Sequence, residues 1–274
     1  MEVFDIFLDV DGTLCNDQGI VPKSARKAVK TAQEKGHRVY LCTGRCKAEL
    51  FDHILEIGFD GIIGSGGGYI EVDGDVLYHK TFCDTQLTQL LEYFKKNRIG
   101  YYAECNHGMY VDEIYAGWLE NFITTSNENG KEVAGIEEFK EALHPINTTT
   151  QLTNVNKLSI LCNGTPFKQI NDDLGNEFTV HYNTVPMLNE EAGEISLKGI
   201  SKSSAIAYIQ ANEEKPRRTM AIGDSSNDID MLQHVDISIA MGNAGDHIKE
   251  VAMYTTKTHD EGGIEHAFIK YEIL

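Results

Sequence analysis

The stretch from Phe4 to Leu14 reads Phe-Asp-Ile-Phe-Leu-Asp-Val-Asp-Gly-Thr-Leu, and the rest of the chain is organised around it. Its first half is an apolar run that only Asp5 interrupts, and the run is about as long as one buried strand. The run ends in two carboxylates, Asp9 and Asp11, and Gly12 follows them directly. The pattern predicts a buried strand whose carboxyl end carries a polar turn.

Two carboxylates at the end of a buried strand repel each other, and one pKa rises unless a cation lies between them. A glycine beside them lets the backbone turn sharply and approach a ligand. In open α/β sheets the ligand crevice lies at the carboxyl ends of the strands. The stretch therefore favours a metal-bound aspartate site, although a strand that simply ends in an Asp-Gly turn has the same sequence.

The composition is that of a globular protein with a sizeable core. The length of 274 residues favours two modest domains over one, and 41% of the residues are hydrophobic against 24% charged. The formal net charge of −18 would repel a phosphate backbone, so the sequence predicts no nucleic-acid binding. A small anionic substrate is compatible with this charge if cations gather in one pocket.

The sequence also predicts a cytoplasmic protein with no membrane partner, and it leaves the oligomeric state open. The N-terminus has no basic segment followed by an apolar one, and no apolar run approaches membrane-spanning length. The 6 cysteines show no Cys-x-x-Cys spacing, so we expect free thiols in a reducing compartment. The cysteines are Cys15, Cys42, Cys46, Cys83, Cys105 and Cys162.

Helices and strands are expected to alternate after the first strand. Pro22 suits the first turn of a helix that runs to about residue 35, and strands are expected at residues 37–42 and 61–63 with a helix over residues 47–57 between them. This alternation is typical of a parallel sheet with right-handed crossovers. The first part of the chain is therefore expected to be α/β.

The middle of the chain does not continue this alternation of helices and strands. Residues 82–189 mix short strands and helices, with loop-like composition at residues 126–130, and we expect a separate α+β domain there. The pattern of a parallel α/β sheet is expected to resume with a strand at residues 194–197. The predicted fold is an α/β protein with a Rossmann-like parallel-sheet core, formed by residues 1–81 and 190–274, and an inserted α+β cap domain.

Polar residues follow four of the expected core strands. Because parallel strands place their carboxyl ends along one edge, we expect these groups to converge. Each has a structural explanation by itself, since Thr43-Gly44 could be a turn and the acids of the last group could cap a helix. Together they favour an active site. The groups are Asp9 with Asp11; Thr43 with Gly44; Lys198 or Lys202; and Gly223-Asp-Ser-Ser-Asn-Asp228.

On these residues the chain resembles the haloacid dehalogenase-like (HAD) hydrolase superfamily, in particular the Cof-type phosphatases of its subclass IIB. The resemblance covers residues 1–81 and 190–274, and the middle segment lies where the subclass carries its cap. Ser65-Gly-Gly-Gly replaces the Asn-Gly-Gly that is common in the subclass. The matching motifs are Asp9-Val-Asp-Gly-Thr-Leu, Thr43-Gly-Arg, Gly199-Ile-Ser-Lys202, Gly223-Asp-Ser-Ser-Asn-Asp228 and Met241-Gly-Asn-Ala244.

The resemblance implies a magnesium-dependent phosphatase that acts on a small phosphorylated metabolite, such as a sugar phosphate. Asp9 would attack phosphorus to form an aspartyl-phosphate, and Asp11 would protonate the leaving group and then deprotonate water. Mg²⁺ prefers oxygen ligands. The implied metal-site residues are Asp9 and Asp224 through their side chains, Asp11 through its carbonyl, Ser225 as a further contact and Asp228 as support. The implied phosphate-binding residues are Val10, Thr43, Gly44, Lys202 and Asn227.

Two alternative functions stay open on the same scaffold. A phosphotransferase resembling phosphomannomutase would return the phosphoryl group to a sugar, and product analysis with a bisphosphate activator would distinguish it. A non-enzymatic regulatory protein has no need to keep Asp9, Asp11, Lys202 and Asp224 together. For the lysine, Lys202 follows Ser201, a favourable N-cap residue, and matches the third motif, with Lys198 as the alternative.

Overall fold

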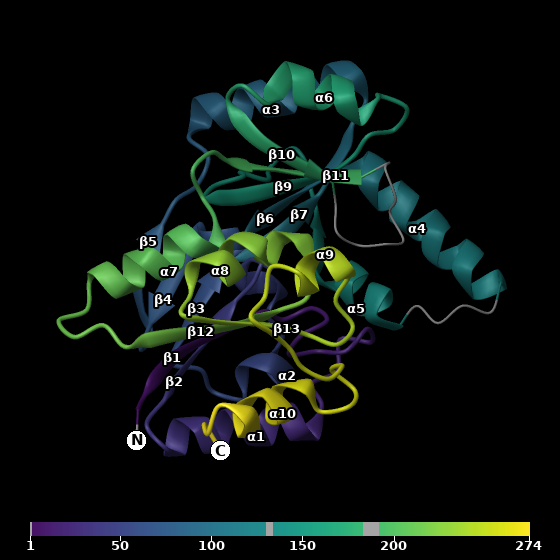
Figure 1. The fold of residues 1–274 in the computed structure, drawn as a ribbon. Coiled ribbons are helices and arrows are strands. Elements are labelled where there is room, and N and C mark those ends of the chain that lie inside the picture. The colour runs from purple at the N-terminus through teal and green to yellow at the C-terminus, as the bar shows by residue number, and fades with distance from the viewer. Residues whose placement is uncertain (1, 130–133, 183–191) are drawn as a thin grey trace. The chain divides into compact units, whose positions relative to one another are not determined.

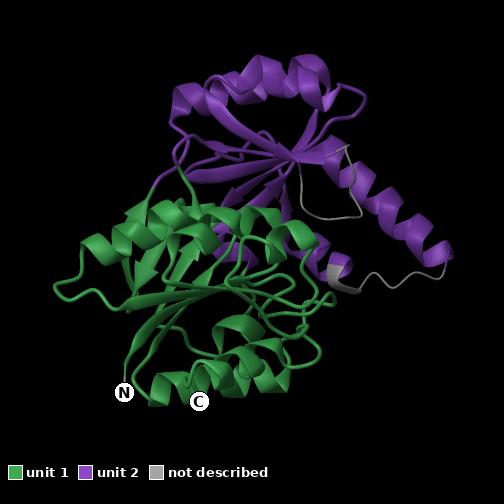
Figure 2. Cartoon of the chain, viewed as in Figure 1, with its two compact units in different colours: residues 1–45, 50–79, 200–274 green, residues 46–49, 80–199 purple. Residues whose placement is uncertain are grey.

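The computed structural model describes residues 2–129, 134–182 and 192–274, which divide into two compact units (Figure 2). No helix in these ranges is long and apolar enough to cross a membrane. Unit 1 consists of Met1–Arg45, Leu50–His79 and Ile200–Leu274, and unit 2 consists of Cys46–Glu49 and Lys80–Gly199.

Unit 1 is built on an eight-stranded sheet with the strand order β14-β13-β12-β1-β2-β3-β4-β5 (Figure 1). The buried strand β1 (Phe4–Leu8) lies inside the sheet and pairs in parallel with β2 (Arg38–Cys42) and β12 (Arg218–Gly223). The Rossmann-like α/β core is therefore confirmed. The remaining strands are the parallel β3 (Gly61–Gly64), β13 (Ile237–Ala240) and β14 (Tyr254–Thr255), and the antiparallel β4 (Tyr69–Val72) and β5 (Asp75–His79).

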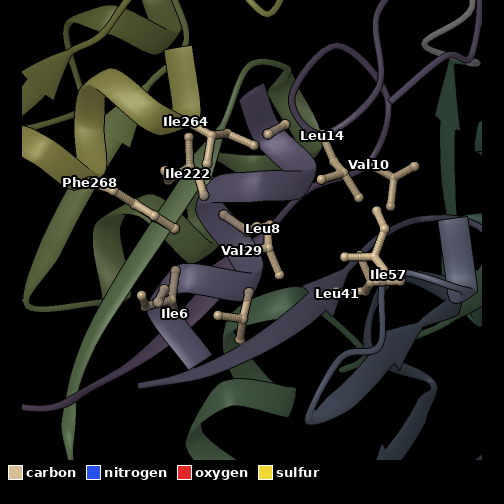
Figure 3. Close-up of a cluster of buried hydrophobic side chains, with 14 of the residues drawn as sticks. Ile6, Leu8, Val10, Leu14, Val29, Leu41, Ile57, Ile222, Ile264 and Phe268 are labelled. Carbon is tan, nitrogen blue, oxygen red and sulfur yellow. The ribbon is translucent and has the colours of Figure 1, made fainter. Parts of the chain in front are cut away.

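Two hydrophobic cores pack against this sheet. Successive side chains of β1 point to opposite faces of the sheet, so they enter different cores. Ile6 and Leu8 pack with residues of α1 (Lys23–Glu34), α2 (Asp52–Leu55) and α10 (Gly263–Lys270) (Figure 3). Phe7 packs in a second cluster with residues of α7, α8 and α9. These helices span Lys202–Ala211, Ile229–His234 and Asp246–Lys249.

Unit 2 contains a six-stranded sheet with the order β10-β11-β9-β6-β7-β8, in which only β7 and β8 pair in parallel among the described strands. Helices α3 (Asp84–Asn97) and α6 (Phe167–Leu174) lie side by side over it (Figure 1), and the Tyr93 hydroxyl donates to Asp173 Oδ2 across them at 2.8 Å. Helices α4 (Glu113–Glu128) and α5 (Ala134–Ala142) complete the unit. The strands are β6 (Gly100–Cys105), β7 (Gly108–Val111), β8 (Leu143–Pro145), β9 (Val155–Leu161), β10 (Phe178–Tyr182) and β11 (Ala192–Leu197).

The strand expected at residues 194–197 does not belong to the parallel core. It is part of β11, which pairs antiparallel with β9 and β10 in unit 2. Its alternation of polar and apolar residues, from Glu194 to Leu197, is typical of an antiparallel strand rather than of a strand in a parallel core. The expected boundary at residues 189 and 190 lies outside the described residues, and the core unit resumes at Ile200.

The single helix expected over residues 47–57 is wrong as well. The segment forms a 3₁₀ turn at Lys47–Glu49 and the separate helix α2, because its apolar residues serve two cores. Cys46 is buried in a cluster of unit 2, whereas Leu50 is buried in a cluster of unit 1. A continuous helix could not deliver both residues to different cores.

The loop expected at residues 126–130 is also wrong where the structure describes it. Helix α4 continues to Glu128, and Gly130 lies outside the described residues. Ser126 is buried on the same helix face as Leu119 and Ile123, so tertiary packing overrides the polar composition here.

Candidate active site

Three neighbouring strands of unit 1 deliver polar residues to the same edge of the sheet. Asp9 follows β1, Thr43 follows β2 and Asp224 follows β12. Leu8 is in register with both Leu41 and Ile222, so the three chain segments leave the sheet at the same level. Three of the four expected strand ends therefore meet at one edge, whereas the fourth, residues 194–197, is part of β11 in unit 2.

The ammonium group of Lys202, the first residue of α7, lies between two buried carboxylates. Its Nζ donates to Oδ1 of Asp9 and to Oδ1 of Asp228, each at 2.6 Å. The three side chains are 2%, 5% and 0% exposed, respectively. Burial by itself lowers the pKa of Lys202, but the Asp228 and Asp9 carboxylates outweigh burial and leave that pKa raised. The lysine therefore stays charged beside Asp9.

Lys198, the alternative lysine, has a partner in its own unit. It belongs to unit 2, where its Nζ donates to the carbonyl oxygen of Asn176 at 2.8 Å on an exposed part of that unit. Within unit 1, the structure places Lys202 beside Asp9.

Asp228 uses both of its carboxylate oxygens to brace the site. While Oδ1 accepts from Lys202, Oδ2 accepts the backbone N–H groups of Asp224 and Ser225, each at 3.0 Å. A Cβ atom on Gly223 would lie 2.6 Å from Asp228 Cγ, so this glycine makes room for the brace. Asp228 therefore supports the loop that carries Asp224.

Asp9, Asp224 and Asp228 each place a carboxylate oxygen within 4.8 Å of the others. Burial and then the Asp228 charge raise the pKa of Asp224 to about 7, against a hydrogen bond of 3.0 Å from the Thr13 hydroxyl to Asp224 Oδ1. Burial and Asp228 also raise the pKa of Asp9, despite the opposing effect of Lys202. Three carboxylates thus face one ammonium group, and a divalent cation would neutralise the excess charge.

The chain after Asp11 turns sharply at Gly12, which lies against Asp224. Gly12 has a φ of +75°, and a Cβ atom there would lie 2.3 Å from Asp224 Oδ2. Asn243 holds this turn, because its Nδ2 donates to the Gly12 carbonyl oxygen at 2.8 Å. No role was predicted for Asn243 or Thr13, although the motif Met241-Gly-Asn-Ala244 already contained the asparagine.

The loop after β2 is braced by the segment Ser65-Gly-Gly. The Ser65 and Gly66 N–H groups donate to the carbonyl oxygens of Arg45 and Thr43 at 2.8 and 2.9 Å. The buried Thr43 hydroxyl accepts the Arg45 N–H at 3.1 Å. A Cβ atom on Gly67 would lie 2.2 Å from the Ser201 carbonyl oxygen, so the same segment also packs against the start of α7.

The other predicted phosphate-binding groups lie around these loops. A Cβ atom on Gly44 would lie 3.6 Å from Asn227 Nδ2, so the two residues are neighbours. The Ser225 hydroxyl, predicted as a metal contact, donates to Asn227 Oδ1 at 2.7 Å and thereby orders the loop. Val10 buries its side chain in the core (Figure 3), and its carbonyl oxygen accepts the Cys15 N–H at 2.8 Å.

The guanidinium group of Arg45 donates hydrogen bonds to both oxygens of the Asp11 carboxylate. Arg45 donates from Nη2 to Asp11 Oδ1 at 2.6 Å and from Nε to Asp11 Oδ2 at 2.9 Å. The Asp11 side chain is 62% exposed, in contrast to the buried Asp9. Arg45 is the third residue of the motif Thr43-Gly-Arg, but no role was predicted for it.

The chain matches the profile of a known family along almost its whole length. The profile is described as haloacid dehalogenase-like hydrolase and matches residues 6–268. A Bacillus subtilis (strain 168) relative named 5-amino-6-(5-phospho-D-ribitylamino)uracil phosphatase is 27% identical over 282 residues, which cover 98% of this chain and 95% of the relative.

Solved structures share the fold over the full length. A hypothetical protein from Geobacillus kaustophilus HTA426 has a TM-score of 0.80 at 23% identity and covers 99% of this chain and 100% of its own. A HAD subclass IIB sugar phosphatase has a TM-score of 0.74 at 21% identity, with coverage of 99% and 100%.

Proposed function

The chain belongs to the haloacid dehalogenase-like hydrolase family and is a phosphatase, and we propose that it hydrolyses a small phosphorylated metabolite with the help of Mg²⁺ and through a phosphorylated Asp9. The observation that carries this proposal is the contact of Lys202 with Asp9 at 2.6 Å inside a buried group of carboxylates. A buried cation beside a carboxylate nucleophile offers charge to an incoming phosphoryl group.

In the proposed reaction an Asp9 carboxylate oxygen attacks phosphorus, and the ester oxygen of the substrate leaves with a proton from Asp11. Water then attacks the phosphorylated Asp9 while Asp11 accepts its proton, which releases inorganic phosphate and restores the Asp9 carboxylate. The phosphoryl group would be bound by the amides of Val10 and Gly44 and by the side chains of Thr43, Lys202 and Asn227.

The carboxylates fit a magnesium ion. Asp9 and Asp224 each direct one oxygen to a described partner, Lys202 and Thr13, respectively, and their Oδ2 atoms accept no hydrogen bond from a described residue. Hard oxygen donors of this kind suit Mg²⁺, so Asp9 and Asp224 would hold it together with the Asp11 carbonyl. When bound, the ion would neutralise the charge that builds up as two anions meet.

A small metabolite is the substrate class that the charge of the protein favours. The net charge of −18 disfavours polyanionic substrates. The Bacillus subtilis relative is named for a phosphorylated ribityl compound, and one structural neighbour is a sugar phosphatase. A phosphorylated sugar or polyol is therefore the first class to test. The 6 cysteines all lie in the described residues and form no disulfide, and we also propose a reducing, cytoplasmic location.

We propose that unit 2 is the cap that selects the substrate. Its sheet buries a charged group in which Lys157 Nζ lies 3.3 Å from Glu104 Oε2 and 3.0 Å from Glu194 Oε2. Ser159 donates to Glu104 Oε1 at 2.8 Å. Burying charges is costly unless they are paired, so these residues are the first to vary when substrate preference is mapped.

The test is a phosphate-release screen over phosphorylated sugars, polyols and nucleotides with Mg²⁺ present, with Asp9→Asn as the matched inactive control. Release of inorganic phosphate by wild type from a small phosphorylated metabolite, and none by Asp9→Asn, is expected. A transfer of the phosphoryl group to a second sugar in place of release would favour the phosphotransferase. Equal release by wild type and Asp9→Asn would contradict the proposal.

A further inference from the structure

Arg45 donates a hydrogen bond to each oxygen of the Asp11 carboxylate, at 2.6 and 2.9 Å. We propose that Arg45 is a positioning residue, which acts on turnover by holding Asp11 in the orientation that proton transfer requires. This inference rests on the proposed function, because it assigns Asp11 the proton-transfer step.

Asp11 needs such a partner because little else restrains it. Its side chain is 62% exposed, so without the arginine both side-chain torsions would be free to sample several rotamers. A planar guanidinium group that bonds both oxygens fixes the plane of the carboxylate as well as its distance. The ammonium group of a lysine cannot reproduce this two-point contact.

Arg45 is itself held firmly. Its backbone N–H donates to Thr43 Oγ1 at 3.1 Å, its carbonyl oxygen accepts the Ser65 N–H at 2.8 Å, and its side chain is only 21% exposed. The loop that carries the predicted phosphate-binding residues Thr43 and Gly44 therefore also carries the residue that orients Asp11. Two parts of the site are thereby kept in register by one short segment.

The contact leaves Asp11 able to accept a proton. A carboxylate has about four lone-pair positions, and the arginine occupies one on each oxygen. In the hydrolytic step, Asp11 takes a proton from water as the water oxygen bonds to phosphorus. The bond between phosphorus and the Asp9 oxygen breaks, and its electron pair returns to the Asp9 carboxylate. Misplacement of Asp11 by about 1 Å could cost about 10²-fold in rate.

A role in orienting Asp11 differs from a direct role in binding the phosphoryl group. p-Nitrophenyl phosphate has a good leaving group, so phosphorylation of Asp9 from it needs little help from an acid. Hydrolysis of the phosphorylated Asp9 needs Asp11 whatever the substrate was. If Arg45 acts through Asp11, an Arg45 variant should phosphorylate quickly from p-nitrophenyl phosphate and then stall.

The experiment compares wild type, Arg45→Lys, Arg45→Met, Asp11→Asn and the double variant Arg45→Met with Asp11→Asn, with p-nitrophenyl phosphate in rapid-quench kinetics. The Arg45 variants should show a burst of about one equivalent of p-nitrophenol, followed by a kcat about 10- to 100-fold below wild type. Arg45→Met should add little to the loss caused by Asp11→Asn, since residues that act as a unit are not additive. Arg26→Met, which changes a helical arginine bonded to the His53 carbonyl oxygen, is the control and should behave as wild type.

Loss of the burst together with a raised KM would assign Arg45 to the phosphoryl group and overturn the inference. Fully additive losses in the double variant, or wild-type kcat in both Arg45 variants, would overturn it too. An Asp11→Asn variant with wild-type kcat would instead contradict the proposed proton-transfer role, so the two failures can be told apart.

Discussion

Lys202 Nζ lies 2.6 Å from Asp9 Oδ1, although the two residues are 193 positions apart in the chain. The fold brings them together because Asp9 follows the inner strand β1 and Lys202 begins α7, whose residues pack in the same cluster as Phe7 of β1. A cation at a helix N-terminus meets the positive end of the helix dipole, at a cost of about 0.3–1 kcal/mol when exposed. The carboxylates of Asp9 and Asp228 offset that cost.

Replacing this lysine should impair phosphoryl transfer. Lys202→Met removes a preorganised positive charge and is expected to lower kcat/KM by at least about 10²-fold. Steady-state kinetics on one substrate measures the loss. The matched control is Lys198→Met, which removes a lysine bonded to the Asn176 carbonyl oxygen in unit 2 and should change kcat/KM far less. The reverse ranking of the two variants would move the role to Lys198.

Gly12 and Gly19 form a matched pair for testing the contact with Asp224. Both have positive φ angles, +75° and +73°, so alanine costs about 1–2 kcal/mol of backbone strain at either site. A Cβ atom on Gly12 would lie 2.3 Å from Asp224 Oδ2, whereas one on Gly19 would meet nothing within 4 Å. Gly12→Ala should therefore raise the Mg²⁺ concentration needed for half-maximal activity, and Gly19→Ala should not. Equal responses would show that crowding of Asp224 is unimportant.

Metal removal should abolish activity reversibly. Chelation is expected to stop phosphate release, and added Mg²⁺ should restore it, while the larger Ca²⁺ should substitute poorly. Mg²⁺ should also raise the unfolding temperature of wild type, because a bound cation stabilises the Asp224 carboxylate against burial and the Asp228 charge, which raise its pKa to about 7. Asp224→Asn should lose most of this thermal response. Full activity after exhaustive chelation would contradict a metal-assisted site.

His37 should make stability depend on pH. The Phe4 N–H donates to His37 Nδ1 at 3.1 Å, and burial, followed by the charges of Arg217 and Lys35, lowers the pKa of His37 from its ordinary 6.5. The unfolded chain then binds a proton more readily, so this stabilisation is complete above about pH 6.5 and is lost as the pH falls through that value.

The matching variant is His37→Gln, which keeps an acceptor but does not titrate. The free energy of unfolding of wild type minus that of the variant, measured by urea denaturation, should decrease as the pH is lowered from about 8 to about 5. Titrating groups common to both proteins cancel in this difference. A difference that does not change with pH would contradict the account.

Local sequence patterns were sufficient for the parallel core. The apolar run before Asp9 is buried on both faces in β1, and Asp5, the polar exception, is satisfied because Arg38 bonds both of its oxygens at 2.8 Å. Polar residues after strands converge in any parallel sheet, so the site around Asp9 and Asp224 could be expected from spacing and from the family resemblance.

What the sequence could not show depends on tertiary partners. The segment after Arg45 contributes Cys46 to the core of one unit and Leu50 to the core of the other. The spacing of apolar residues in the sequence does not reveal such a division. The prediction placed residues 194–197 in the parallel core, but their polar–apolar alternation suits the antiparallel strand β11, which pairs with β9 and β10. The hydrogen bonds from Arg45 to Asp11 depend on side-chain geometry, which the motif Thr43-Gly-Arg alone does not specify.

The central claim is that Asp9 carries the phosphoryl group during turnover. The most direct measurement uses Asp11→Asn, in which hydrolysis of the intermediate should be slow, mixed with p-nitrophenyl phosphate, quenched in acid and digested for peptide mass spectrometry. The account predicts a phosphorylated peptide that contains Asp9, and no such peptide when Asp9→Asn is added to the variant. Active wild type combined with no phosphorylation of Asp9 in the quenched Asp11→Asn protein would contradict it.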